Sequence, residues 1–392
     1  MSSIYLDWAA TAPPDPEIQE QVRRIAQQFY ANPSALHSLG REAEKTLSDC
    51  RRRMAGLLGC QPGELLFTSG ATEANNMILF SQLQKKQDRR ILIGGIEHAS
   101  VYEPAQTLKR LGFQVVEVPA DNTGRIDPGR IRAALDERTV AVAVMLVNNE
   151  TGRIQPIREI AEVIRDYQKQ NGKKILLHTD AVQALGKIPF NPRLLDVDSA
   201  SLSAHKIGGP RGAGALYVRQ GRIQRFLFSG GGQEYGMRPG TENLPGIYGF
   251  LLAAEKAVGA IEENHLQAHT AMQTLLGELE RLSEVSVIPA GRSAAGSGEY
   301  SPYILNISIP PLPGEVLVRV LEEEGFIVST GSACSSRKKD RFRVLENMGV
   351  SRREAFSALR VSTGPGVGSA ELSALAAAIR RRVAELMKAI PG

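Results

Sequence analysis

The sequence predicts an α/β protein whose large domain is built on a mostly parallel sheet, with a smaller α+β domain beside it. From about Glu64 to Val218, short runs rich in β-branched residues alternate with helical stretches, which is the pattern of strands joined by crossover helices. Proline stands at the expected start of two of these helices, in Asp127-Pro128 and Gln155-Pro156. With 392 residues and 42% hydrophobic content, the chain is long enough for two domains.

The elements of the large domain follow one another in chain order. The strand candidates are ELLF (64–67), RRILIGGI (89–96), FQVVEVPA (113–120), TVAVAVMLV (139–147), KKILLHTDA (173–181), DSASLSA (198–204) and GALYVR (214–219). Helices are expected over 37–58, 131–135 and 157–167, the last two as crossovers. We expect this domain to span residues 16–258.

A second pattern follows the glycine cluster at 230–232 and predicts a smaller α+β unit. Its expected elements are a long helix over about 245–282, a flexible loop or surface turn in GRSAAGSGEYSP (291–302), strands in YILNISI (303–309) and FIVST (326–330), and a helix over about 370–389. We expect this small domain to comprise residues 1–15 and 259–392.

The bulk composition limits the partners and the compartment. The 47 basic and 42 acidic residues give a formal charge of +5 that is spread along the chain, so no nucleic-acid partner is indicated. Cys50, Cys60 and Cys334 form no CxxC pair and have no metal-ligand spacing, which indicates neither disulfides nor a metal site. Neither a signal-peptide core nor a membrane-spanning apolar run occurs. We therefore expect a cytoplasmic protein without a membrane anchor.

Two glycine-rich turns are candidates for binding a phosphorylated carbonyl cofactor. In SLSAHKIGGPRG, Lys206 stands between a strand and a glycine turn, beside Ser203 and His205, and a lysine amine can hold a carbonyl group as a Schiff base. In FTSGATEANN, a strand gives way to Ala71 and Thr72 at the start of a helix, where free N–H groups would face an anion. The alternatives are a surface lysine in a turn and an ordinary Ser/Thr helix cap.

Polar residues follow two other predicted strands. Asp180 and Gln183 follow KKILLHTDA, and His98 follows RRILIGGI; the ends of parallel strands are where α/β proteins build sites. A carboxylate at Asp180 can keep a pyridine nitrogen protonated, and Gln183 can donate to a ring hydroxyl. His98 can stack on the ring and move protons near neutral pH. The alternatives are a helix cap for Asp180 and a solvated loop histidine for His98.

Cys334 lies in STGSACSSRKKDRFR, between small residues and a run of cations. Small neighbours favour an exposed, mobile loop, and the cations favour the nucleophilic thiolate. Cys50 and Cys60 lie in or beside a predicted helix, where a cysteine is usually inert. Arg360, in LRVSTG, has the planar fork that suits an amino-acid carboxylate. The alternatives are a solvated loop or a docking surface for acidic partners in the basic run, and a surface ion pair for Arg360.

Ten segments of the chain, taken in order, resemble the signature segments of the cysteine desulfurases. They are IYLDWAATAP, NPSALHSLG, FTSGATEANN, IEHASV, VNNETGRIQPI, HTDAVQALGKIPF, SLSAHKIGGPRG, GGGQEYGMRPGTEN, GSACSS and LRVSTG. They span residues 4–364 and keep the family's order over nearly the whole chain. The separation of Cys334 from Arg360 resembles the group with a long cysteine loop.

This resemblance implies the fold-type-I architecture of the class-V aminotransferases, pyridoxal 5′-phosphate (PLP) as cofactor and a homodimer. The substrate would be L-cysteine, and the products would be L-alanine and a persulfide on Cys334. The sulfur would pass to an acceptor such as an iron–sulfur scaffold protein, or serve thiolated cofactors or tRNA. An iron–sulfur cluster would contact the protein only transiently, at Cys334.

The match also assigns roles to residues. Lys206 would carry the cofactor and take the Cα proton, His98 would stack on the ring and take the thiol proton of the substrate, and Asp180 would pair with the pyridine nitrogen. The further contacts would be Ala71, Thr72, Asn149, Gln183, Ser203 and His205 to the cofactor, Thr241 to the phosphate from the other subunit, and Asn32 and Arg360 to the substrate carboxylate.

The chain departs from the usual family pattern at three single positions and in the segment STGPGVGS after Arg360, which lacks the phenylalanine and threonine common there. Trp8 and Ala12 stand where asparagine and threonine are usual, and Tyr235 stands where arginine is usual, which could alter the rim of the site or the dimer contact.

Two other functions stay open. One is a different class-V reaction in the same pocket, either selenocysteine cleavage or transamination. The other is a non-catalytic sulfur-relay scaffold that has kept the fold.

Overall fold

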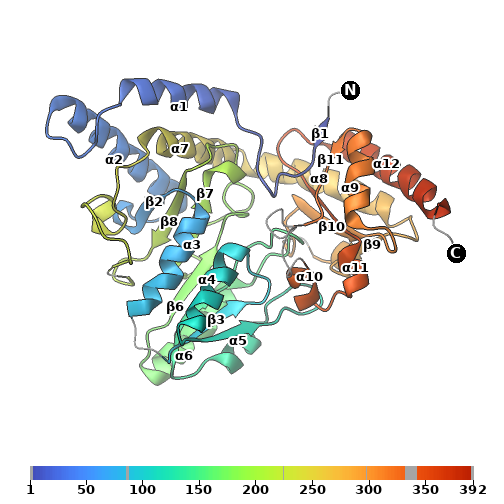
Figure 1. Cartoon of the computed structure of the whole chain (residues 1–392), viewed down its shortest axis with the longest axis horizontal. Coiled ribbons are helices and arrows are strands. Elements are labelled where there is room, and N and C mark those ends of the chain that lie inside the picture. The colour runs from blue at the N-terminus through green and yellow to red at the C-terminus, as the bar shows by residue number, and fades with distance from the viewer. Residues whose placement is uncertain (1–2, 85–87, 224, 297, 332–341, 390–392) are drawn as a thin grey trace.

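The computed structural model describes residues 3–84, 88–223, 225–296, 298–331 and 342–389 (Figure 1). Its larger part is a seven-stranded sheet in the order β2-β8-β7-β6-β5-β3-β4. The strands are β2 (Leu65–Thr68), β3 (Arg90–Gly94), β4 (Gln114–Val118), β5 (Thr139–Ala143), β6 (Leu176–Asp180), β7 (Ser199–Ser203) and β8 (Gly214–Val218). All pairs are parallel except those of β8, which runs antiparallel to β2 and β7. The predicted α/β fold and its seven strands are confirmed.

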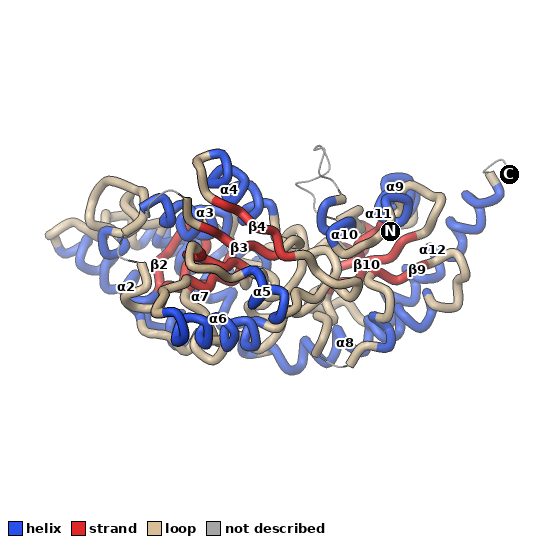
Figure 2. The backbone as a smooth tube through the Cα atoms, turned by 90° about the horizontal axis from the view of Figure 1, so that it is seen from below, coloured by secondary structure: helices blue, strands red, loops and turns tan. Residues whose placement is uncertain are grey.

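Helices cover both faces of this sheet, as the edge-on view shows (Figure 2). They are α1 (Pro16–Gln28), α2 (Ser38–Leu58), α3 (Ala71–Phe80), α4 (Ala99–Arg110), α5 (Pro128–Ala134), α6 (Ile157–Asn171) and α7 (Leu244–Gly259). Neighbouring strand residues alternate between two hydrophobic clusters: Phe67 joins a cluster with residues of α2, α6 and α7, and Leu66 joins one with residues of α3 and α4. Because both faces are buried, the strands read as apolar runs.

The predicted helices are found, with two corrections. Pro128 begins α5 as expected, whereas Pro156 is the N-cap of α6, one position earlier than predicted. The long helix expected over 245–282 is two helices, α7 and α8 (Ile261–Leu279), which meet at Ala260 and are bent by 66°. Among the described residues no single helix meets the length and apolarity needed to cross a membrane; only this bent pair does so, by length and composition, when taken together.

The smaller part contains a three-stranded antiparallel sheet in the order β12-β10-β9. Its elements are β9 (Ser286–Ile288), α9 (Gly314–Glu323), β10 (Ile304–Ser308), β11 (Phe326–Ile327), α10 (Arg343–Asn347), α11 (Arg352–Phe356), β12 (Ala358–Ser362) and α12 (Ser369–Lys388). The N-terminal strand β1 (Ile4–Tyr5) pairs in parallel with β11, and Leu6 packs in the cluster of this part. The predicted helix over 370–389 is α12. The division into two domains at the stated residues stays a prediction.

The stretch 291–302 is only in part the surface loop that its composition suggests. Arg292 and Ser301 are buried, and the Arg292 guanidinium donates to the main-chain carbonyls of Thr151 and Ser301. This buried arginine therefore ties the loop to the connection that follows β5.

Candidate active site

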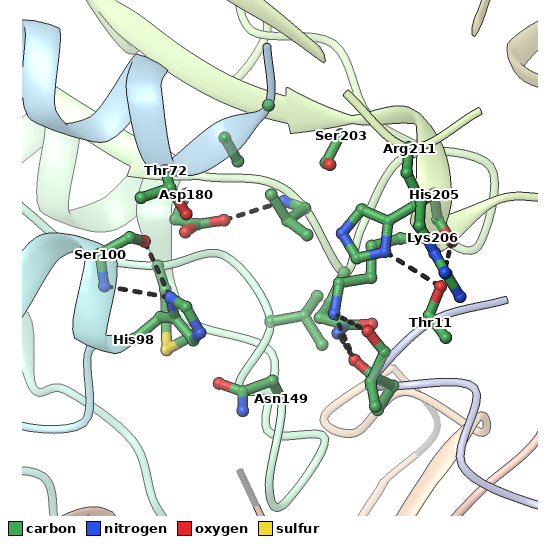
Figure 3. A pocket seen from close by; sticks show the side chains of 18 of the residues that line it. Thr11, Thr72, His98, Ser100, Asn149, Asp180, Ser203, His205, Lys206 and Arg211 are labelled. Carbon is green, nitrogen blue, oxygen red and sulfur yellow. Dashed lines mark hydrogen bonds between the residues drawn. The ribbon is translucent and has the colours of Figure 1, made fainter. Parts of the chain in front are cut away.

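A cavity of about 540 Å³ lies where the carboxyl ends of β3, β6 and β7 meet the N-terminal segment and β12. Its volume falls in the range of small-molecule sites. Ten of the residues predicted for the site line it: Ala71, Thr72, His98, Asn149, Asp180, Gln183, Ser203, His205, Lys206 and Arg360. Figure 3 shows how most of them surround the same space.

Asp180 is the last residue of β6 and is buried. Its Oδ1 accepts a hydrogen bond from the Val182 N–H (3.0 Å), and its Oδ2 accepts one from the side-chain amide of Asn75 (2.8 Å). No helix begins after β6, so the alternative of a helix cap is excluded. The carboxylate is instead held at the wall of the cavity by two hydrogen-bond donors.

Lys206 ends a short 3-10 turn, Ala204–Lys206, between β7 and β8. Its Nζ donates to the carbonyls of Ala9 (2.6 Å) and Ala10 (2.7 Å), as Figure 3 shows. The lysine is therefore not a solvated surface group: the N-terminal segment crosses over it and fixes its amine at the cavity.

In the turn before α3, the Ser69 N–H donates to the Glu73 carboxylate and the Gly70 N–H donates to the Thr68 hydroxyl, which leaves the N–H groups of Ala71 and Thr72 to face the cavity. The N-cap is Gly70, with φ of 155° and no side-chain hydrogen bond, so the alternative of a Ser/Thr cap is excluded. The backbone passes very close to β8 here, because a Cβ at Gly214 would lie 2.5 Å from the Gly70 Cα. Free N–H groups at a helix start attract anions.

Three other residues of the cavity wall add hydrogen-bond donors and one cation. Ser203, His205 and Arg211 line the same cavity. Burial, followed by the charges of Lys206 and Arg211, lowers the pKa of His205 to about 4, and its Nδ1 lies 3.1 Å from the Thr11 hydroxyl. His205 is therefore neutral at pH 7, and Arg211 supplies the positive charge.

His98 is the N-cap residue of α4 and is half-buried. Its Nδ1 accepts a hydrogen bond from the Ser100 N–H (3.1 Å) and lies 2.8 Å from the Ser100 hydroxyl (Figure 3). Burial lowers the pKa of the ring. The alternative of a solvated loop histidine is therefore wrong.

Arg360 lies in β12 and is 1% exposed. Its guanidinium donates to the Asp7 carboxylate (2.6 Å) and to the Asn149 carbonyl (2.9 Å). Its Nε–H has no partner among the residues that the structure describes. The ion pair is thus a buried one that lines the cavity, and the alternative of a surface ion pair is excluded.

Three predicted site residues are not brought to this cavity. Asn32 is exposed between α1 and α2, and its Oδ1 accepts from the Ser34 N–H (2.9 Å), so within one chain it does not approach Arg360. Thr241 is exposed and does not line the cavity, as expected for a residue assigned to the other subunit. Cys334 lies outside the described residues.

Several residues of the site were not predicted. One of them is Lys187, whose Nζ donates to the side-chain oxygen of the predicted residue Gln183 (2.7 Å); Gln183 in turn donates to the Ala9 carbonyl (2.9 Å). Burial, followed by the charge of Lys206, lowers the pKa of Lys187 to about 7. The others are Asp7, Thr11, Asn75, Ser100, His178 and Arg211. Most of them lie within the motifs already quoted, but their spacing gave no sign that their side chains converge.

The comparisons with known proteins agree with this geometry. The class-V aminotransferase model matches residues 4–375. The cysteine desulfurase IscS of Dictyoglomus turgidum is 36% identical over 92% of this chain and 89% of that protein. A solved NifS-like protein has a TM-score of 0.88 at 34% identity, over 99% of this chain and 100% of that one. The structure of SspA in complex with cysteine has a TM-score of 0.77 at 29% identity, over 92% and 99% of the two chains. The chain therefore belongs to the class-V aminotransferase family and, within it, to the cysteine desulfurases.

Proposed function

We propose that this chain binds PLP in the cavity described above and removes sulfur from L-cysteine, giving L-alanine and a persulfide on Cys334. The observation that carries the proposal is the convergence, around one cavity, of a fixed lysine, a buried carboxylate, an anion-binding turn and a buried arginine. A binding-only scaffold would have no chemical need for all four.

The residues present fit PLP. Its phosphate matches the N–H groups of Ala71 and Thr72 at the start of α3, together with Ser203, His205 and Arg211. Its pyridine nitrogen matches Asp180, whose carboxylate is held by two donors, and its aldehyde matches Lys206. When bound, the cofactor would supply an electron-poor ring that stabilises negative charge next to the substrate Cα.

The chain's own residues would then divide the remaining work. Arg360 can hold the substrate carboxylate through a guanidinium that is already buried and oriented by Asp7. Lys206, whose amine lies at the same cavity, would be the base that takes the Cα proton of the substrate. His98 is the proton-carrying ring at the wall of the cavity.

The sulfur step is assigned to Cys334, as the resemblance implies. Its thiolate attacks the sulfur of L-cysteine, forming an S–S bond while the C–S bond of the substrate breaks. The carbon keeps the electron pair and takes up protons to leave as L-alanine, and the enzyme keeps the persulfide. An acceptor thiol, such as that of an iron–sulfur scaffold protein, then removes the terminal sulfur.

A homodimer in a reducing compartment fits this function. Large apolar side chains are exposed near the α1–α2 connection and in the stretch before α7, both at one end of the molecule (Figure 1). They are Tyr30, Leu36, Leu39, Leu227, Phe228 and Tyr235. A second copy covering this end would bring Thr241 toward a neighbouring site. The cytoplasm would keep the nucleophilic thiol reduced between turnovers.

The proposal is tested by locating the cofactor and following the products. Purified protein reconstituted with PLP and reduced with borohydride should carry the cofactor on Lys206, identified by peptide mass mapping, and untreated enzyme should form alanine from L-cysteine. Lys206→Ala should do neither. Attachment at Lys206 with turnover of another amino acid, and none of cysteine, would retain the cofactor site and refute the substrate.

A further inference from the structure

We infer that Asn75 is a positioning residue that joins Asp180 and His98 into one hydrogen-bonded unit, in which the His98 ring carries its proton on Nε2. The inference deepens the proposed function and rests on it for the role of the cavity. Besides Asp180 and His98, the unit contains Ser100, which also lines the cavity, and Asn75 and His178, which do not.

Asn75 occupies the centre of this unit. It lies in α3, is fully buried, and uses both hydrogens of its amide nitrogen. One points to Asp180 Oδ2 and one to the Ser100 hydroxyl oxygen, each at 2.8 Å. Its Oδ1 lies 2.8 Å from His178 Nε2. An asparagine amide offers two N–H donors and an acceptor oxygen, so both hydrogens and the oxygen of this side chain have hydrogen-bond partners.

The direction of the bonds at His98 follows from the backbone. The Ser100 N–H can only donate, so His98 Nδ1, which receives it, must be unprotonated. The Ser100 hydroxyl oxygen accepts from Asn75, which leaves its own hydrogen for the same Nδ1, 2.8 Å away. Two donors therefore converge on Nδ1, and the proton of the neutral ring is on Nε2.

The other end of the unit fixes how the Asn75 amide is turned. The Asp180 carboxylate needs a donor, so the amide nitrogen faces it and the amide oxygen faces His178. Burial lowers the pKa of His178 to about 4, so its ring is neutral and donates from Nε2, while its Nδ1 lies 2.9 Å from the Ser199 hydroxyl. Every bond from His178 to His98 then runs in a compatible direction.

This arrangement changes the part that His98 can play. A ring with Nδ1 engaged by two donors and a proton on Nε2 can donate from Nε2 but has no free lone pair there to take a proton. His98 is thus placed to donate to an anionic sulfur or carboxylate in the cavity. This inference differs from the expectation that His98 takes the thiol proton of the substrate: it assigns that proton to another group or to solvent.

The test compares two neighbouring asparagines given the same substitution. Asn75→Asp replaces both donors by an oxygen that faces the Asp180 carboxylate. Asn76→Asp is the matched control, because the Asn76 amide only reaches back to the Thr72 carbonyl of its own helix (2.8 Å). The readouts are the His98 tautomer in cofactor-free protein, by 15N NMR of histidine-labelled samples assigned with His98→Gln, and the Kd for PLP.

We expect the wild-type His98 to show a protonated Nε2 and an unprotonated Nδ1 near neutral pH. Asn75→Asp should weaken PLP binding about tenfold or more, because a hydrogen bond to a charged group is lost. It should also shift the Nδ1 resonance, because an aspartate oxygen would accept the Ser100 hydroxyl hydrogen that otherwise points to Nδ1. Asn76→Asp should change neither readout. Ser100→Ala, a second variant that keeps the backbone donor and removes the hydroxyl donor, should shift the Nδ1 resonance.

A wild-type His98 protonated at Nδ1 would overturn the inference, as would an Asn75→Asp protein indistinguishable from Asn76→Asp in both readouts. Because the tautomer is measured without PLP or cysteine, a protein that makes no alanine would refute the proposed function and leave this result standing.

Discussion

Replacing Glu234 by glutamine should destabilise the protein and loosen the segment that leads to Thr241. Glu234 is almost completely buried and forms a two-pronged ion pair with Arg51, with both N–O distances 2.7 Å. Its Oε2 also accepts from the Phe67 N–H of β2 (2.8 Å). A glutamine would place an amide N–H against one of these donors and leave the buried Arg51 charge without its counter-ion. Breaking one side of a buried pair costs about 4 kcal/mol.

The assay compares the urea unfolding of Glu234→Gln with that of Glu20→Gln, which removes an ion pair on the surface. Glu20 binds Arg23 and Arg24 with distances of 2.7 to 2.9 Å, but all three side chains are exposed. Its replacement by glutamine should leave the urea midpoint unchanged, because exposed pairs are screened by solvent. Glu234→Gln should lower the midpoint and weaken PLP binding. Equal effects of the two substitutions would refute the argument from burial.

Three further predictions concern the site and its surroundings. Burial lowers the pKa of Lys187 to about 7 from its ordinary value of 10.5, so between these pH values the unfolded chain binds this proton and the folded chain does not. The free energy of unfolding should therefore rise with pH over this range, by up to about 1.4 kcal/mol per pH unit. Lys187→Met should remove that rise, as measured by urea unfolding at several pH values. Gly214→Ala should weaken PLP binding, measured by equilibrium dialysis, because its Cβ would press on Gly70; unchanged affinity would show that this close approach does not matter. Trp8 is the only tryptophan; its ring lies against Gly364, and it precedes Ala9 and Ala10, which line the cavity. Its fluorescence should change when PLP binds, and Gly364→Ala should shift its emission. A spectrum insensitive to both would contradict this placement.

The parts of the fold that follow local patterns could be predicted from the sequence. Most strands of the large sheet are rich in apolar residues, as expected where helices cover both faces. The bend at Ala260 was missed, because helical patterns on both sides hide the single Gly259. The two-residue strand β1 was also missed, because its partner β11 lies more than 300 residues further along the chain and no local pattern records such a pairing.

The site divides in the same way. Residues within motifs of known chemistry, such as Lys206 and Asp180, could be singled out because their types suit a carbonyl and a pyridine nitrogen. The role of Asn75 could not, because its partners are 25, 103 and 105 positions away and are brought together only by the fold. For Asn32 the motif predicts a contact with the substrate carboxylate, but within a single chain this residue does not line the cavity.

The structure shows the surroundings of the three single residues that depart from the usual family pattern. Trp8 fills the space above Gly364, and its indole N–H donates to the Tyr5 carbonyl (3.1 Å). Ala12 is buried, and its N–H donates to the His205 carbonyl (2.9 Å). Tyr235 is exposed, and Arg51 lies 5.1 Å from its ring centroid. The first two thus help to hold the N-terminal segment across Lys206.

The most direct test of the central claim is to measure persulfide and alanine after L-cysteine is added to Cys334→Ser and to a control, Cys60→Ser. Burial raises the pKa of the Cys60 thiol to about 12, so it stays protonated and should not react. Wild type and Cys60→Ser should form alanine and carry a persulfide that peptide mapping places on Cys334. Cys334→Ser should keep the absorbance of bound PLP but form no persulfide. Normal sulfur transfer by Cys334→Ser would contradict the account.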